Sequence, residues 1–262
     1  MLTSVQNTRV KEIKGLHQKK NRDREKVFLI EGVRFVEEAL AAGVTVNTVI
    51  HSPKLITTLR GQELLYKAEN GGVELLEVAD HVLEHLADTE NPQGVMAVLP
   101  QLEQGSIPPE GRLVLLVDGV QDPGNLGTII RTADAAGVGA VLLGEGTVDL
   151  YNPKTLRSTM GSLFHLPVTR VNALEVITAM KQQGWRVAVA DVQGKVEWFE
   201  ADFYKPMVIV VGSEARGPRE EILSIADDRL RITMPGRAES LNVAIATGVL
   251  LFEYIRQNNQ LL

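Results

Sequence analysis

The sequence predicts an α/β protein in which a parallel sheet with helices on both faces follows a smaller N-terminal α/β domain. The larger part opens with a continuous apolar run, RLVLLVDGV at 112–120, which is typical of a strand buried on both faces of a sheet. Further apolar runs follow, each separated from the next by a stretch whose apolar residues have helical spacing. This alternation of strands and helices indicates a parallel sheet.

The chain divides at a polar segment that is rich in proline and glycine. PQLEQGSIPPEG occupies residues 100–111 and is typical of a linker. We therefore expect a first domain over 1–100, a linker over 101–111 and a second domain over 112–262. A chain of 262 residues is long enough for two domains.

The first domain is predicted to contain four strands with helices between them. The strands are expected at VFLI (27–30), VNTVI (46–50), VELLEV (73–78) and GVMAVL (94–99). A unit of this length has the size of a small independent domain.

In the second domain, the sharpest motifs come directly after expected strands. The strands are expected at 112–120, 138–144, 165–171, 185–192, 207–212 and 229–235, and a C-terminal helix is expected over 240–257. In open α/β sheets, ligands bind at the carboxyl ends of the strands. We therefore expect the functional site at that edge of the sheet.

Composition excludes several classes of protein. Cysteine is absent, which excludes disulfides, cysteine-ligated zinc and methylation of pyrimidine C5 through a cysteine adduct. The N-terminus is polar and contains no apolar signal core. The longest apolar stretch, at 243–252, is shorter than the roughly 20 residues that span a bilayer. We expect a cytoplasmic protein without membrane contact.

Charge is distributed unevenly along the chain. The net charge of −6 by itself disfavours a nucleic-acid partner, because binding phosphates requires positive charge. Residues 9–26, however, contain eight lysines and arginines against three acidic residues. The segment is either a solvated helix or an arm that contacts phosphates. In the second interpretation the candidate RNA-binding residues are Arg9, Lys11, Lys19, Lys20 and Arg22.

The first motif, DGVQDPGNLGTIIRTADAAG, occupies 118–137 and matches neither common nucleotide-binding pattern. Its glycines do not give G-x-G-x-x-G, and Asn125-Leu126 stands where a P-loop requires Lys-Ser/Thr. What remains is a tight turn before a helix, with Asn125 near the helix start and Arg131 two turns further on. A capping asparagine and a surface arginine would explain the same residues.

Two further motifs follow later strands. VVGSEARGP (210–218) contains a glycine that would let a bulky ligand approach the backbone closely, although a plain loop before a helix explains it as well. ITMPGRAESLNVAIATGVLLFE (232–253) places Ser240 and Asn242 at the start of an apolar helix. An N-cap serine is the simplest interpretation of that position.

Taken together and in this order, the three motifs resemble the SpoU family of SPOUT methyltransferases. The family pattern of Asn, Gly and Arg is present at 125, 127 and 131, Gly-Ser-Glu at 212–214, and Ser-Leu-Asn-Val at 240–243. Two departures are mild: Ala133 falls one place early, and Glu214 is followed by Ala-Arg-Gly. The segment FLIEG (28–32) is similar to the small RNA-binding domain that many SpoU members carry.

The resemblance implies transfer of a methyl group from S-adenosylmethionine to a ribose 2′-hydroxyl of structured RNA. It implies a C-terminal trefoil knot and a homodimer, and it involves no metal. The first domain looks like that of members that modify ribosomal RNA, so ribosomal RNA is preferred to tRNA as substrate. The catalytic residues implied are Asn125, Arg131, Glu214, Ser240 and Asn242. The cofactor-binding residues implied are Val211, Gly212, Ile232 and Leu241, acting largely through the backbone.

Arg131 is the base usually assigned in this family, yet a guanidinium has a pKa above about 12 and rarely gives up its proton. We expect Arg131 instead to bind a phosphate next to the ribose and to stabilise developing negative charge on oxygen.

Other functions fit parts of the sequence. Glu145 would suit a ribose-binding acid of a nicotinamide-dependent oxidoreductase, but the dinucleotide pattern is missing. A tRNA ribose methyltransferase, a base-nitrogen methyltransferase and a non-catalytic RNA-binding protein with a degenerate transferase domain also remain open. His81 and His85 fit the zinc-peptidase pattern H-x-x-E-H, for which a pair on a helix surface is the simpler explanation.

Overall fold

The computed structural model describes residues 1–102, 113–203 and 206–258. It divides into two compact units, of which the first comprises Met1–Glu103 with Asp149–Phe164 and the second Gln104–Val148 with His165–Leu262. Residues 103–111 of the expected linker lie outside the described residues. No helix in the described part of the chain has both the length and the apolar character needed to cross a membrane.

The first unit contains the four predicted strands as one mixed sheet, in the order β1-β4-β2-β3. β4 is antiparallel to β1 and β2, whereas β2 and β3 are parallel. The strands are β1 (Val27–Glu31), β2 (Thr48–His51), β3 (Glu74–Glu77) and β4 (Val95–Pro100). The helices are α1 (Thr8–Gly15), α2 (Lys19–Glu25), α3 (Val33–Ala41), α4 (Pro53–Ile56), α5 (Leu59–Asn70) and α6 (Asp80–Leu86).

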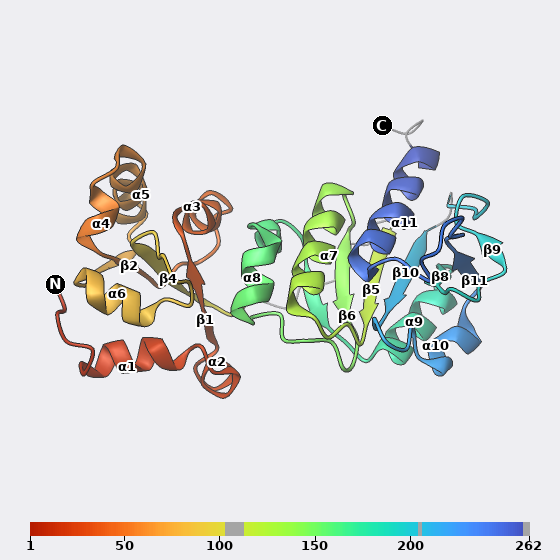
Figure 1. Cartoon of the computed structure of the whole chain (residues 1–262), viewed down its shortest axis with the longest axis horizontal. Coiled ribbons are helices and arrows are strands. Elements are labelled where there is room, and N and C mark those ends of the chain that lie inside the picture. Colours follow the sequence, from red (N-terminus) through yellow and green to blue (C-terminus); the bar gives the residue numbers. More distant parts are fainter. Residues whose placement is uncertain (103–112, 204–205, 259–262) are drawn as a thin grey trace. The chain divides into compact units, whose positions relative to one another are not determined.

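Both faces of this sheet are covered by helices. Apolar side chains of α1 and α6 form one core cluster with Leu29, Ile50 and Met96 of the strands. α3, α4 and α5 lie together on the other side (Figure 1), and α3 packs on β1 and β4. The apolar residues of successive strands thus serve two separate core layers, as expected of a sheet between helices.

Residues 149–164 belong to the first unit, although they lie within the stretch 112–262 that was expected to form the second domain. They contain α8 (Pro153–Thr159) and a short 3-10 helix (Ser162–Phe164), and α8 packs on β1. The ring of Tyr151 lies 4.6 Å from that of Phe28, which is fully buried. Such aromatic burial is a strong reason for this segment to fold with the first unit.

The second unit is built on a seven-stranded parallel sheet in the order β7-β6-β5-β10-β8-β11-β9. Its strands are β5 (Leu113–Asp118), β6 (Ala140–Leu143), β7 (Val168–Arg170), β8 (Arg186–Ala190), β9 (Val196–Glu197), β10 (Met207–Gly212) and β11 (Asp228–Arg231). Its helices are α7 (Pro123–Ala135), α9 (Ala173–Gln182), α10 (Glu220–Ile225) and α11 (Val243–Asn258). The predicted parallel α/β fold is confirmed.

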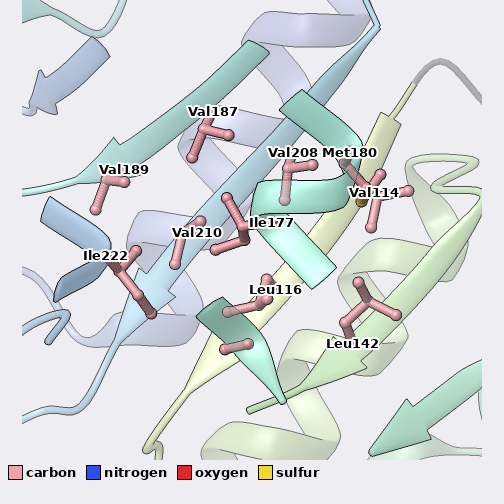
Figure 2. Close-up of a cluster of buried hydrophobic side chains, with 11 residues drawn as sticks. Val114, Leu116, Leu142, Ile177, Met180, Val187, Val189, Val208, Val210 and Ile222 are labelled. Atoms are coloured by element: carbon pink, nitrogen blue, oxygen red, sulfur yellow. The ribbon is translucent and has the colours of Figure 1, made fainter. Parts of the chain in front are cut away.

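The centre of this sheet is buried on both faces. Every residue of β5 and of β10 is buried, which explains why these strands are apolar without alternation. Figure 2 shows Ile177 and Met180 of α9 and Ile222 of α10 packed against valines of β8 and β10. α7 and α11 pack against each other, and α11 also contacts β10.

The strand order brings the first two motifs together. β10 lies between β5 and β8, and its last residue, Gly212, is opposite Asp118 at the end of β5. The loops after both strands therefore leave the sheet side by side at its carboxyl edge. The third motif begins directly after β11, two strands away at the same edge.

Candidate active site

Three of the five expected catalytic residues form one hydrogen-bonded chain. The Nδ2 atom of Asn242 donates to Oδ1 of Asn125 over 3.0 Å, and Nδ2 of Asn125 donates to Oε1 of Glu214 over 2.8 Å. Each residue comes from a different motif and from a different loop or helix start. The chain therefore links all three motifs through side chains that were selected from the sequence.

The Glu214 carboxylate also accepts two backbone hydrogen bonds. The N–H groups of Gln121 and Asp122 donate to it over 3.3 Å and 3.4 Å. Partial desolvation would raise the pKa of this carboxyl, but the bonds from Asn125 and the two backbone groups outweigh it, so the pKa lies below the ordinary value. A carboxylate with a lowered pKa and occupied lone pairs is a poor base, and it holds the loop before α7 in place.

Asn125 does not cap α7, contrary to the simpler interpretation of the first motif. The N-cap is Asp122, whose Oδ1 accepts from the backbone N–H of Asn125 over 2.8 Å, and Pro123 follows in the first turn. Because Asp122 performs the capping, the side-chain amide of Asn125 is free to bridge Asn242 and Glu214.

The cap of α11 is Asn242 and not Ser240, so the N-cap serine interpretation is wrong. Oδ1 of Asn242 accepts from the N–H of Ala244 over 2.9 Å. Since this oxygen faces the helix, the amino group of the same side chain must point away, toward Asn125. The helix start thus fixes the orientation of the Asn242 amide. Ser240 is exposed and makes no hydrogen bond with any described residue.

Arg131 lies in α7, two turns beyond Asn125, and its side chain is exposed. It forms no ion pair or hydrogen bond with any residue in the described ranges. The structure therefore does not include Arg131 in the chain of Asn125, Glu214 and Asn242. An arginine held on a rigid helix without a protein partner has all five N–H donors available to a substrate.

The loop after β10 folds back tightly at Gly212. Ser213 and Gly217 exchange two backbone hydrogen bonds of 3.1 Å and 2.9 Å. A Cβ atom on Gly212 would lie 2.0 Å from the backbone N of Pro218, so the chain itself requires glycine here. This requirement comes from the protein's own backbone, which agrees with the interpretation of the motif as a loop before a helix. Val211, the preceding residue, is buried within β10.

The segment from Ile232 to Leu241 keeps most of its backbone polar groups available. Between these residues, no hydrogen bond is formed with the backbone of another described residue, and only Thr233 contacts a side chain, the carboxylate of Glu197, through its backbone. Ile232 is half-buried and Leu241 is partly exposed, so apolar surface accompanies the open N–H and C=O groups. Backbone donors and acceptors beside apolar side chains suit an adenosine and an amino-acid group. The residues present therefore fit S-adenosylmethionine.

An ion pair to a buried aspartate at the same edge was not found from the sequence. Asp118 is 2% exposed and accepts from Nε of Arg219 over 2.9 Å. Arg219 also donates to Glu145 over 2.6 Å, and Glu145 accepts from the N–H of Ala173 over 3.3 Å. Glu145 thus connects loops at this edge of the sheet. An aspartate at a strand end is the only sequence signal for this network.

The basic segment at 9–26 is less available than its sequence suggests. Arg22 is 4% exposed, and its guanidinium donates to the carbonyls of Leu16 and His17 over 2.7 Å and 2.8 Å and pairs with Asp149. A guanidinium engaged in this way has no access to phosphate. We therefore revise our expectation for Arg22, whose role is to hold residue 149 against the turn after α1.

The other four candidate RNA-binding residues are at the surface. Lys11 and Lys20 are exposed, Lys19 pairs with Asp23 over 3.0 Å, and Arg9 pairs with Glu74. Exposed ion pairs of this kind are weak and can exchange for a phosphate. Lys11 and Lys20 are the clearest candidates.

The histidine motif on α6 does not form a metal site in the described residues. Nε2 of His81 lies 2.9 Å from the carbonyl oxygen of Thr3. Over the described ranges, no group of three or more His, Asp or Glu side chains is arranged to hold a metal ion.

Solved structures of similar proteins define the class. An rRNA methyltransferase from Sinorhizobium meliloti with bound S-adenosylmethionine is 37% identical, with a TM-score of 0.87 over 98% of this chain and 97% of that chain. AviRb from Streptomyces viridochromogenes, a SpoU methyltransferase in complex with the same cofactor, is 30% identical, with a TM-score of 0.88 over 97% and 99%. With the site described above, these likenesses define an α/β methyltransferase of the SPOUT class.

The family follows from the sequence matches. Residues 112–252 match the SpoU rRNA methylase family, and residues 7–97 match the MRM3-like substrate-binding domain. A 23S rRNA (guanosine(2553)-2′-O)-methyltransferase, RlmP of Bacillus subtilis, is 38% identical over 96% of this chain and 97% of its own length. The chain belongs to the SpoU rRNA methylase family.

Proposed function

We propose that this protein transfers a methyl group from S-adenosylmethionine to a ribose 2′-hydroxyl of ribosomal RNA. The observation that carries the proposal is the chain of Asn242, Asn125 and Glu214 at the carboxyl edge of the sheet, next to loops that fit the cofactor. The relatives named above act on ribosomal RNA, which supports the substrate class.

The residues divide the work according to their placement. The bound cofactor supplies an electrophilic methyl group on a sulfonium, and no metal is required. Glu214 stays ionised and holds the loop at 121–125, while Asn125 and Asn242 present amides of fixed orientation. Arg131 binds a phosphate next to the target ribose and stabilises negative charge on the attacking oxygen. Ser240 offers an exposed hydroxyl for a hydrogen bond to that ribose.

The test is methylation of RNA in vitro. With labelled cofactor, we expect methyl transfer to ribosomal RNA from cells without this protein, at a site that resists alkaline hydrolysis because its 2′-oxygen is blocked. Labelling of tRNA alone would favour the tRNA alternative, and cofactor binding without transfer to any RNA would favour a non-catalytic role. The same experiment identifies the target nucleotide, which differs between relatives. One relative modifies guanosine, and another, from Streptomyces viridochromogenes, modifies uridine.

The first unit is proposed to grip the RNA, with Lys11 and Lys20 contacting phosphates. Replacing both lysines with alanine should weaken binding of a ribosomal RNA fragment. It should also make the slope of log K against log salt shallower by about two, or about one per lost phosphate contact. Filter binding at several salt concentrations measures both. Lys67→Ala, an exposed lysine of α5, is the control, and equal slopes in all proteins would refute this role.

The protein is also proposed to be a homodimer that works in the cytoplasm, with the family's trefoil knot. Support for the dimer comes from α11, where Ile245 is 56% and Phe252 is 52% exposed. These residues are two helical turns apart and therefore lie on one face of the helix. Leu241, 36% exposed, extends the apolar surface before the helix.

Disrupting this apolar face should dissociate the dimer. In light-scattering measurements, Ile245→Asp combined with Phe252→Asp is expected to convert the dimer into a monomer, because a charge cannot be buried unpaired at an interface. Leu59→Asp places the same charge on α5, where the leucine is 79% exposed, and should leave the dimer intact. A monomeric unmodified protein would contradict the dimer itself, and a dimeric double variant would contradict this surface.

A further inference from the structure

The segment from Ile232 to Leu241 is fastened at very few points. Its backbone makes no hydrogen bond with the backbone of any described residue, and within the described ranges its one backbone bond to a side chain runs from Thr233 to the carboxylate of Glu197. Among the described residues, its side chains form one hydrogen bond, from the hydroxyl of Thr233 to Oε1 of Glu197 over 2.7 Å. A segment of ten residues that must present a fixed surface to a ligand thus has a single lateral anchor before α11 begins.

Glu197 also fixes the residue on which the segment begins. Nε of Arg231 donates to the same oxygen, Oε1, over 2.9 Å, and the terminal NH2 group of that guanidinium donates to it over 2.5 Å. The backbone N–H of Trp198 donates to the carbonyl of Arg231 over 3.0 Å. The carboxylate therefore holds the residues on both sides of Ile232: Arg231 by an ion pair, and Thr233 by its hydroxyl and its backbone N–H.

The placement of Glu197 makes this anchor stiff. Its side chain is 17% exposed, and Oε2 is buried without a hydrogen-bond partner among the described residues. The residue lies in β9, which pairs with β11 at the edge of the sheet. Because the sheet fixes its backbone, the carboxylate has little freedom to follow a displaced Thr233.

We propose that Glu197 is a positioning residue that sets the affinity for S-adenosylmethionine by holding Arg231 and Thr233 on either side of Ile232. The inference rests on the proposed function, since it assigns the segment 232–241 to the cofactor. Glu197 lies outside all three sequence motifs. Its effect is on binding, because none of its contacts reaches Asn125, Glu214 or Asn242.

The test measures cofactor binding apart from turnover. In calorimetry with S-adenosylhomocysteine, Glu197→Ala should raise Kd about tenfold or more, the scale expected when hydrogen bonds to a charged group are lost. Glu197→Gln keeps one acceptor oxygen and should give an intermediate Kd. Thr233→Val removes only the hydroxyl of an exposed residue and should shift Kd in the same direction, even if Glu197→Ala folds poorly. For all three, kcat at saturating cofactor should stay within about threefold while KM rises.

A second readout needs no ligand. Hydrogen exchange of the Thr233 amide should be faster in Glu197→Ala than in the unmodified protein, because the substitution removes the carboxylate that this N–H contacts. Asp227→Asn is the matched control. Asp227 also pairs with a cation, Lys181, and accepts a hydrogen bond from a backbone N–H. It directly precedes β11, however, and therefore lies at the amino ends of the parallel strands, away from the segment that follows β11. It should lower the melting temperature without changing Kd.

Three outcomes separate the two proposals. Failure of the unmodified protein to bind S-adenosylhomocysteine would overturn the proposed function. Normal binding by the unmodified protein together with unchanged Kd in Glu197→Ala and Thr233→Val would overturn only the role of Glu197. An equal rise in Kd for Asp227→Asn would show that the effect is one of general stability, and would overturn it as well.

Discussion

Replacing Arg131 with alanine is expected to lower kcat by about 10²–10³-fold, the range seen when one donor to a developing oxyanion is removed. The Kd for S-adenosylhomocysteine should change little, because the guanidinium contacts no described residue of the cofactor loops. Arg131→Lys keeps the charge but loses the planar arrangement of donors, so its kcat should lie between that of Arg131→Ala and that of the unmodified protein. Single-turnover methylation of a ribosomal RNA fragment, with calorimetry alongside, measures both quantities.

The melting temperature of Arg131→Ala is the control for this prediction. Arg131 is exposed on a helix, and alanine is a good helix former, so the melting temperature should be unchanged. If Arg131 acted as the base, the rate should rise with pH until the guanidinium titrates. Near-normal turnover of Arg131→Ala would defeat every version of the mechanism and leave the family likeness as one of fold only.

Glu214→Gln is expected to lower kcat about tenfold or more without changing the shape of the pH–rate profile. A glutamine offers one acceptor oxygen where the carboxylate offers two, so its amino group would face a backbone N–H, at either Gln121 or Asp122. The organising role therefore predicts a loss at every pH. If Glu214 were the base, its replacement would instead remove the acid limb of the profile.

The same substitution has a consequence for stability that depends on pH. The pKa of Glu214 is lowered in the folded protein, so its contribution is present above the unfolded-state value of about 4.3 and is lost as pH falls through the lower folded-state value. Melting curves from pH 7 to pH 3 should therefore show the variant and the unmodified protein converging at acid pH. A difference in melting temperature that stays constant down to pH 3 would contradict this assignment.

The sequence was sufficient for the fold class, for most of the strands and for the convergence of the motifs. Each motif follows an apolar run that became a strand, and parallel strands end at one edge of a sheet, so Asn125 and Glu214 could be expected to lie close together. The atom-level contacts needed the structure. Asp122 and Asn242 took the capping positions because several residues at each helix start can cap, and only the backbone path decides among them.

Contacts between residues far apart in the chain were beyond the reach of sequence patterns. The pairing of Arg22 with Asp149 joins residues 127 positions apart, and neither residue belongs to a recognisable motif. A count of basic residues therefore overestimated the charge available for RNA. Likewise, Glu197 lies in a strand of only two residues, which is too short to be recognised from an apolar run in the sequence.

The position of β10 between β5 and β8 imposes an order on folding. β10 follows both neighbours in the chain, so the middle of the sheet must stay open until residues 207–212 have been synthesised. Until then, two fully or largely buried strands have unpaired edges, which are the kind of surface that promotes aggregation. Pairing across such long sequence separations is also slow, because loops must close before the contacts form. The same strand that aligns Gly212 with Asp118 thus makes the nascent chain depend on rapid completion of its own core.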